Sequence, residues 1–135
     1  MTAPQRTAAF FRLADRGVAS AHALLKAEQF EDTALYVQQI VERVARALLT
    51  HAGVPFGTSH NLAQMADALP KDHVFKERIR QFDEFSTAVT AYRYPSPSGH
   101  LKGPPQTGHL EESLSRAERL VRDAKALVYG AQAGS

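Results

Sequence analysis

Apolar residues recur at three- and four-residue steps along most of the chain, which is the spacing of amphipathic α-helices. The first stripe predicts a helix over about residues 5–28 and consists of Phe11, Ala14, Val18, Ala21 and Leu25. A second predicts a helix from about Asp32 to His51 and consists of Val37, Ile40, Val41, Val44 and Leu48, with His51 read as its extension. It stops before Gly53 and Pro55, because Gly accepts a left-handed conformation and Pro cannot continue a helix.

Three further helices are predicted along the rest of the chain. A short one runs from Thr58 or Ser59 to Leu69, before Pro70. A long one runs from Asp72 to Arg93, with the aromatic stripe Phe75, Ile79, Phe82, Phe85, Val89 and Tyr92, and the last runs from about Leu110 to Val128. Strand alternation is not found in any segment. We therefore predict an all-α fold, an antiparallel helical bundle of four long helices plus one short helix.

Residues 94–109 interrupt the helical pattern. They contain four of the seven prolines and three of the eight glycines, so they form a loop of sixteen residues. Loops of this length inside a small domain are usually functional or mobile.

Composition narrows the class of protein. The 135 residues suit a single domain, with its core over about 7–129. The absence of cysteine excludes disulfides, thiolate metal sites and cysteine nucleophiles, and we expect neither a metal nor a cofactor. A formal charge of +2 is too small to argue for nucleic-acid binding by charge alone. Because no stretch has the length and apolarity of a membrane-spanning helix, we expect a cytoplasmic protein.

Most of the polar candidates have a structural interpretation. His22 and His73 fit structural or solvated roles, and His60 fits capping or packing at the start of the short helix. Glu42, Arg43 and Arg46 lie on the polar side of the second helix. Their spacing favours a solvated face over an inward-facing charged cluster.

Two Arg–His pairs have a spacing that suits phosphate chemistry. Arg46 and His51 diverge, since an i,i+5 pair lies roughly 140° apart around a helix. Arg93 and His100 can converge, because Gly99 allows the loop to fold back. Arg offers a planar fork for phosphate, and His suits proton transfer at neutral pH. The alternative is that Arg93 partners a helix dipole and that His100 is solvated.

The order of several short motifs resembles the HEPN family, small helical bundles of prokaryotes often encoded beside a minimal nucleotidyltransferase. The stretch 38–49 (QQIVERVARALL) is similar to the family's glutamine, glutamate and basic pattern. It is followed by Gly53-Val54, by Ser59-His60-Asn61-Leu62 and by 91–95 (AYRYP). These motifs occur in the family's order across about residues 7–129.

The resemblance implies roles for specific residues. Glu42 matches an acidic residue that faces the bundle in the family. Arg93 and His100 match the Arg and His that the family's ribonucleases use without a metal, usually in a two-fold homodimer. In such an enzyme His100 would be the general base on a ribose 2′-hydroxyl, and Arg93 would stabilise charge on the adjacent phosphate.

Three functions therefore remain open. The leading one is binding of a nucleotide or of RNA phosphate near Arg93, with Lys102, His109, Glu42 and Arg46 as further candidates, in a toxin–antitoxin-like pair with a nucleotidyltransferase. The second is a metal-independent ribonuclease using Arg93 and His100. The third is a non-catalytic subunit that only binds a partner protein.

Overall fold

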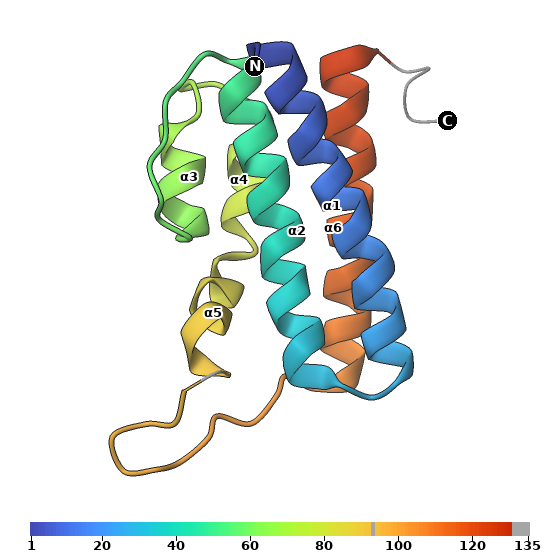
Figure 1. The fold of residues 1–135 in the computed structure, drawn as a ribbon, viewed down its shortest axis with the longest axis vertical. Coiled ribbons are helices and arrows are strands. Elements are labelled where there is room, and N and C mark those ends of the chain that lie inside the picture. Colours follow the sequence, from blue (N-terminus) through green and yellow to red (C-terminus); the bar gives the residue numbers. More distant parts are fainter. Residues whose placement is uncertain (93, 131–135) are drawn as a thin grey trace.

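The computed structural model describes residues 1–92 and 94–130, and every regular element in this part of the chain is helical. The long helices are α1 (Ala3–Lys26), α2 (Phe30–His51) and α6 (Thr107–Tyr129), and they lie side by side (Figure 1). The shorter elements are α3 (Leu62–Ala68), α4 (Lys76–Arg80), a 3-10 helix η1 (Asp83–Thr87) and α5 (Ala88–Ala91). The predicted all-α bundle is confirmed.

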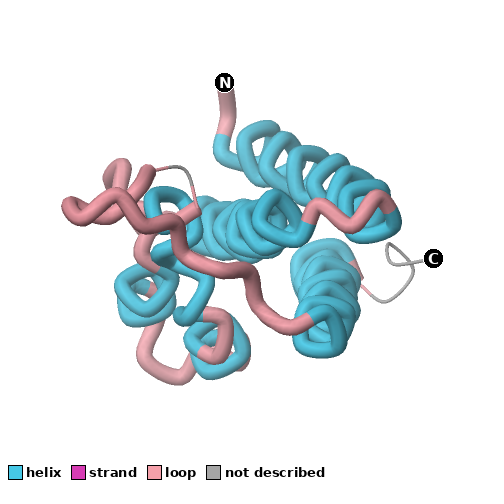
Figure 2. The backbone as a smooth tube through the Cα atoms, turned by 90° about the horizontal axis from the view of Figure 1, so that it is seen from below, coloured by secondary structure: helices cyan, strands magenta, loops and turns pink. Residues whose placement is uncertain are grey.

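Helix α2 is the centre of the bundle. Seen from below, α1 and α6 lie on one side of α2 and the shorter helices on the other (Figure 2). Helix α1 runs antiparallel to both α2 and α6 (Figure 1). Because α2 is covered on most sides, residues such as Ile40, Val44 and Leu48 are at most 1% exposed, and so is the polar Gln38.

A close contact between α1 and α2 explains a glycine inside a long helix. A Cβ atom added to Gly17 would lie 2.9 Å from Cγ1 of Ile40, which is fully buried. Gly is less favourable than Ala in a helix interior, so it is retained here for space.

The second helix ends where the sequence predicts. It stops at His51, and Gly53 adopts a φ of +73°, the left-handed conformation that glycine tolerates best. His51 itself is exposed, so the prediction that it extends the apolar stripe is wrong. Its position past the last buried turn, which ends at Leu49, places it at the rim of the bundle.

The predicted long helix from Asp72 to Arg93 is instead the succession α4, η1 and α5. Two side chains in this segment explain the break, because they bond to the start of α3. Asp83 accepts a hydrogen bond from the backbone N–H of Ala63 at 3.1 Å, and Ser86 accepts one from that of Leu62 at 2.9 Å. Asp and Ser that bond to backbone in this way favour caps and turns over helix interiors. In residues 1–92 and 94–130 the bundle therefore has three long helices, where four were predicted.

The aromatic stripe is buried although the helix is broken. Phe75, Ile79, Phe82 and Phe85 are at most 5% exposed, and Tyr92 is partly buried. The side chain of Val89 lies outside the described part. The long loop is shorter than predicted, because α6 begins at Thr107, which puts His109 in its first turn.

No helix in residues 1–92 and 94–130 has both the length and the apolar composition needed to cross a bilayer.

Candidate functional site

A cleft lies where the loop after α5 returns to the start of α6. Its volume is about 310 Å³, and we call it the loop cleft. It is lined by Glu84, Phe85, Ala88, Tyr92, Lys102, Gly103, Pro104, Pro105 and His109. Two of the predicted phosphate-binding residues, Lys102 and His109, therefore share one concavity. The loop between α5 and α6 extends from the lower end of the bundle, which is the end opposite the N-terminus (Figure 1).

Lys102 is held at the cleft by an aromatic ring. Its Nζ lies 5.7 Å from the centroid of the Tyr92 ring, within the range of a cation–π contact. Burial of Tyr92 raises the pKa of its phenol, and the charges of Glu31 and Glu84 raise it further. Tyr92 is thus a neutral hydrogen-bond donor at neutral pH, and the ammonium of Lys102 is exposed beside it.

His109 also lines the cleft. Its ring stacks on Phe85, with 6.1 Å between the centroids and 12° between the planes. Its Nε2 is paired with a carboxylate oxygen of Glu84. The stacking and the contact with Glu84 together fix the orientation of an imidazole that is otherwise half-exposed.

The first turn of α6 borders the cleft through His109. Its N-cap residue, Gln106, makes no side-chain capping bond to the amides that follow it. The first N–H groups of a helix have no partner within the helix, and the helix dipole favours negative charge near them. Because His109 lies in this turn and lines the cleft, an anion bound there would approach these amides.

The predicted catalytic pair is only partly described. Arg93 lies outside the described residues. His100 is exposed, at the end of a tight turn in which the N–H of Ser96 donates to the carbonyl of His100 at 2.7 Å. The N–H of His100 donates to Oγ of Ser96 at 3.1 Å, and Gly99 has a φ of +84°. The chain turns at Gly99, and the predicted approach of His100 to Arg93 falls outside the described residues.

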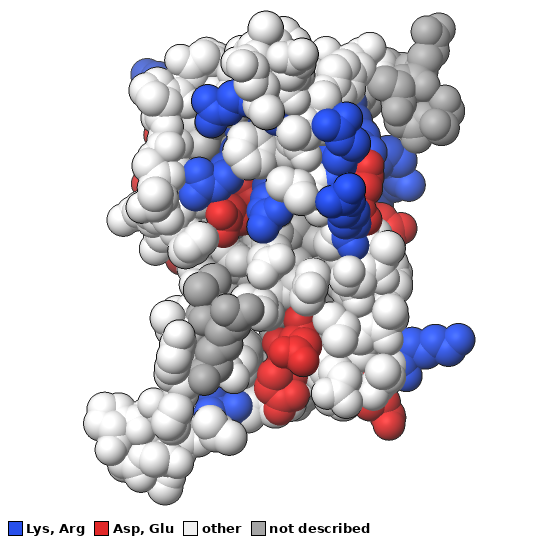
Figure 3. All heavy atoms as spheres, in the orientation of Figure 1, with Lys and Arg blue, Asp and Glu red and all other residues white. Residues whose placement is uncertain are grey.

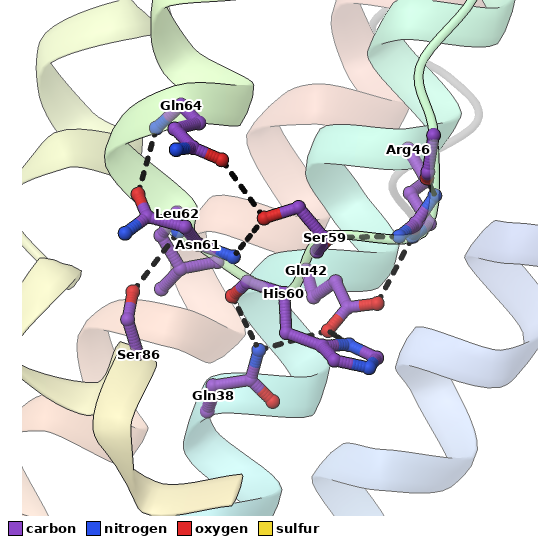
Figure 4. A network of polar contacts seen from close by, with 10 residues as sticks. Gln38, Glu42, Arg46, Ser59, His60, Asn61, Leu62, Gln64 and Ser86 are labelled. Atoms are coloured by element: carbon purple, nitrogen blue, oxygen red, sulfur yellow. Dashed lines mark hydrogen bonds and ion pairs between the residues drawn. The ribbon is translucent and has the colours of Figure 1, made fainter.

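A second group of polar residues surrounds Glu42 on α2 (Figure 4). Glu42 is 6% exposed and accepts hydrogen bonds from Nε2 of Gln38 at 2.8 Å and Nε of Arg46 at 2.9 Å. Nδ1 of His60 lies 2.8 Å from Oε1 of Glu42, the oxygen that also accepts from Gln38. Burial raises the pKa of Glu42, but the bonds from Gln38, His60 and Arg46 outweigh burial and lower it overall. The expectation of a solvated Glu42 is wrong, because the following loop covers this part of α2.

Arg46 ties that loop to α2. Its Nη1 donates to the carbonyl of Gly57 and its Nη2 to the carbonyl of Ser59, each at 3.0 Å. The guanidinium also lies over the ring of Phe56, 5.8 Å from its centroid. With the bond to Glu42, three of its donors serve internal contacts. Its predicted role in binding phosphate stays a prediction.

The Glu42 group and the loop cleft are separate. Arg46 lines another pocket, of about 330 Å³, together with Arg6 of α1. Basic side chains gather over the upper parts of α1 and α2 on one face of the molecule, and acidic ones lie lower on α2 (Figure 3). Among the described residues, no group of three or more His, Asp or Glu side chains is arranged to hold a metal ion.

Comparison with known proteins identifies the family. The family model of the HEPN domain matches residues 7–128. The chain belongs to the HEPN family. The crystal structure of an archaeal HEPN homologue has the same fold, with a TM-score of 0.67 at 17% sequence identity over 90% of this chain and 97% of that one. The comparison with curated proteins finds no match.

The resemblance predicts that Glu42 faces the bundle, and the structure buries Glu42 beneath the loop that follows α2. The lining residues Glu84 and Phe85 were not predicted as part of a site. Phe85 belongs to the apolar stripe and is read as core from its spacing alone. The only sequence signal for a site there is the excess of aromatic residues just before the proline-rich loop.

Proposed function

We propose that this HEPN protein binds a nucleotide, or a phosphate of RNA, in the loop cleft. The observation that carries the proposal is that Lys102 and His109 line one cleft together with Tyr92. Tyr92 immediately precedes Arg93 in the sequence, the residue expected to hold phosphate. Two of the residues that the sequence suggests for phosphate binding, Lys102 and His109, therefore share this cleft.

The lining of the cleft suits both parts of a nucleotide. Lys102 supplies a compact positive charge, and the first turn of α6 supplies backbone N–H groups for phosphate oxygens. Tyr92, which is only partly buried, supplies aromatic surface on which a base stacks. The volume of about 310 Å³ falls at the lower end of the range for small-molecule sites. A mononucleotide is thus a better match than a dinucleotide.

The negative charge of Glu84 in the cleft disfavours binding of a phosphate. Its carboxylate is paired with His109 in the same cleft, so an incoming phosphate competes with it for the imidazole. Like charges in one site repel. Replacing Glu84 with Gln removes the repulsion and frees His109, so this variant binds the anion more tightly than the wild type.

The test is isothermal titration calorimetry with AMP, with adenosine as the ligand lacking phosphate. We expect Lys102→Ala to weaken AMP binding about tenfold, the effect of losing one charge-assisted contact. We expect Glu84→Gln to strengthen it and Arg93→Ala to weaken it. Lys71→Ala removes the same charge from an exposed position outside the cleft and is the matched control.

Two results contradict the proposal. One is equal affinity for AMP in the wild type, Lys102→Ala and Lys71→Ala. The other is affinity for adenosine as high as for AMP, because then phosphate is not what the cleft recognises. If the wild type binds neither AMP nor single-stranded RNA, the function as a non-catalytic partner-binding subunit is favoured instead.

A second candidate function is metal-independent RNA cleavage by Arg93 and His100. The turn closed by Ser96 and His100 favours it, since it reverses the chain and supports the imidazole on a hydrogen-bonded backbone. His100 would remove the proton of a ribose 2′-hydroxyl, whose oxygen attacks the adjacent phosphorus. The bond to the 5′-oxygen breaks, and that oxygen takes a proton from water, leaving a 2′,3′-cyclic phosphate on one fragment and a 5′-hydroxyl on the other.

The assembly that we propose is a homodimer that pairs with a minimal nucleotidyltransferase in a toxin–antitoxin-like system. HEPN membership supports this through the family resemblance. Sedimentation equilibrium of the purified chain, alone and with a nucleotidyltransferase encoded beside it, tests both parts. A strictly monomeric chain that does not bind that partner contradicts them.

A further inference from the structure

Three arginines meet in a small pocket between α4 and α6, outside the loop cleft. The pocket has a volume of about 180 Å³ and is lined by Arg78, Gln81, Phe82, Arg116 and Arg119. We call it the arginine pocket. None of these residues lines the loop cleft or belongs to the Glu42 group.

Arg116 is fixed in this pocket by neutral partners. Its Nη2 donates to Oε1 of Gln81 at 2.7 Å, and its guanidinium lies 5.1 Å from the centroid of the Phe82 ring. Glu112 stands one helical turn before it, at a spacing that often gives an ion pair, yet the guanidinium turns to Gln81 instead. The positive charge is thus held in place without a carboxylate to neutralise it.

Arg78 and Arg119 bring further charge to the same pocket. Arg78 lies over the ring of Phe75, 5.2 Å from its centroid, and its Nη2 is 3.0 Å from Oδ2 of Asp123. Arg119 is exposed. The ion pairs found among the described residues include neither Arg116 nor Arg119. Of the three guanidinium groups in the pocket, only that of Arg78 is paired with a carboxylate among the described residues. The pocket therefore has an excess of positive charge, which favours binding of an anion.

The size and donors of the pocket define the ligand. A volume of about 180 Å³ is below the usual range for a whole small-molecule ligand, so the pocket suits a small anion or the charged end of a larger molecule. Planar guanidinium forks match phosphate oxygens in pairs. We propose that the arginine pocket binds the terminal phosphate group of a phosphate monoester, at a site separate from the loop cleft.

The test uses the arginine side chains as reporters. The Nε–Hε resonances of the ¹⁵N-labelled Lys102→Ala protein are followed by NMR while inorganic phosphate or AMP is added at constant ionic strength. Working in Lys102→Ala separates this site from the loop cleft. We expect the resonances of Arg116 and Arg119 to shift and to saturate with either ligand. Equal affinity for the two ligands means that only phosphate is recognised, and tighter binding of AMP means that the nucleoside adds contacts.

Two variants and one control decide the outcome. Arg119→Gln changes an exposed residue, so it keeps the fold, and Arg116→Gln removes the fixed guanidinium. Each is expected to weaken phosphate binding about tenfold. Arg12→Gln removes the same charge from an exposed position on α1 and is expected to leave the affinity unchanged. Equal weakening by Arg119→Gln and Arg12→Gln, or unsaturable shifts of all arginines together, would overturn the proposal.

Discussion

The imidazole of His60 lies against the carboxylate of Glu42, with 2.8 Å between Nδ1 and Oε1. The side chain of His60 is 55% exposed, whereas that of Glu42 is only 7% exposed. The loop after α2 is therefore fastened to the helix through a buried anion. Arg46 completes the attachment from the other side of the same carboxylate, at 2.9 Å.

Replacing this carboxylate should destabilise the protein. Glu42→Gln keeps the size of the side chain but leaves Arg46 without its partially buried counter-charge. We expect the free energy of unfolding to fall by about 1–3 kcal/mol, the usual effect of leaving a buried polar group without its partner. Urea unfolding measures it. Glu111→Gln, at an exposed position on α6, is the control and should change stability by less than about 0.5 kcal/mol.

The same carboxylate should make stability depend on pH. The pKa of Glu42 is lowered from 4.5 in the folded protein because the hydrogen bonds it accepts outweigh the effect of burial. A lowered folded-state pKa gives stability that is fully present above the unfolded pKa and is lost as pH falls through the folded value. Urea midpoints measured between pH 7 and pH 3 should fall less steeply in Glu42→Gln than in the wild type. Parallel curves would contradict this assignment.

Two glycines offer opposite tests of helix packing. Gly17→Ala puts a methyl group 2.9 Å from Cγ1 of the buried Ile40, so we expect a loss of about 1–3 kcal/mol from overpacking. Gly108→Ala, in the first turn of α6, meets nothing within 4 Å and should stabilise by up to about 1 kcal/mol through helix propensity. Thermal unfolding of both variants checks the pair. Stabilisation by Gly17→Ala would show that α1 and α2 are not in close contact there.

The sequence predicts the long helices well and the broken one poorly. The stripes of α1, α2 and α6 are regular, and the predicted ends are within a few residues of those observed. The stripe from Phe75 to Phe85 is equally regular, but the side chains of Asp83 and Ser86 bond to the start of α3. This competition involves residues about twenty positions away, so local periodicity does not show it.

The candidate site was predicted residue by residue but not as a whole. The family resemblance suggests Lys102 and His109 as phosphate-binding residues, and their meeting in one cleft depends on the path of the loop between α5 and α6. Glu42 was misread from spacing, because the residues that cover it, such as His60, belong to a segment outside the helix. The periodicity of a helix does not show which of its polar residues are buried by a segment elsewhere in the chain.

The ribonuclease hypothesis makes its own prediction. If His100 is the general base, His100→Ala should slow cleavage of single-stranded RNA at least about 100-fold, the usual contribution of a general base. The measurement is a single-turnover assay of end-labelled RNA in the presence of EDTA. His22→Ala, at an exposed position on α1, should leave the rate unchanged. Cleavage at the wild-type rate by His100→Ala, or no cleavage by the wild type, contradicts the hypothesis.

The most direct measurement of the central claim is a crystal structure of the protein grown with saturating AMP. We predict that the phosphate lies in the loop cleft, within hydrogen-bonding distance of Nζ of Lys102 or of the first amides of α6, with the base against Tyr92. An empty loop cleft, with AMP bound elsewhere or not at all, would contradict the account.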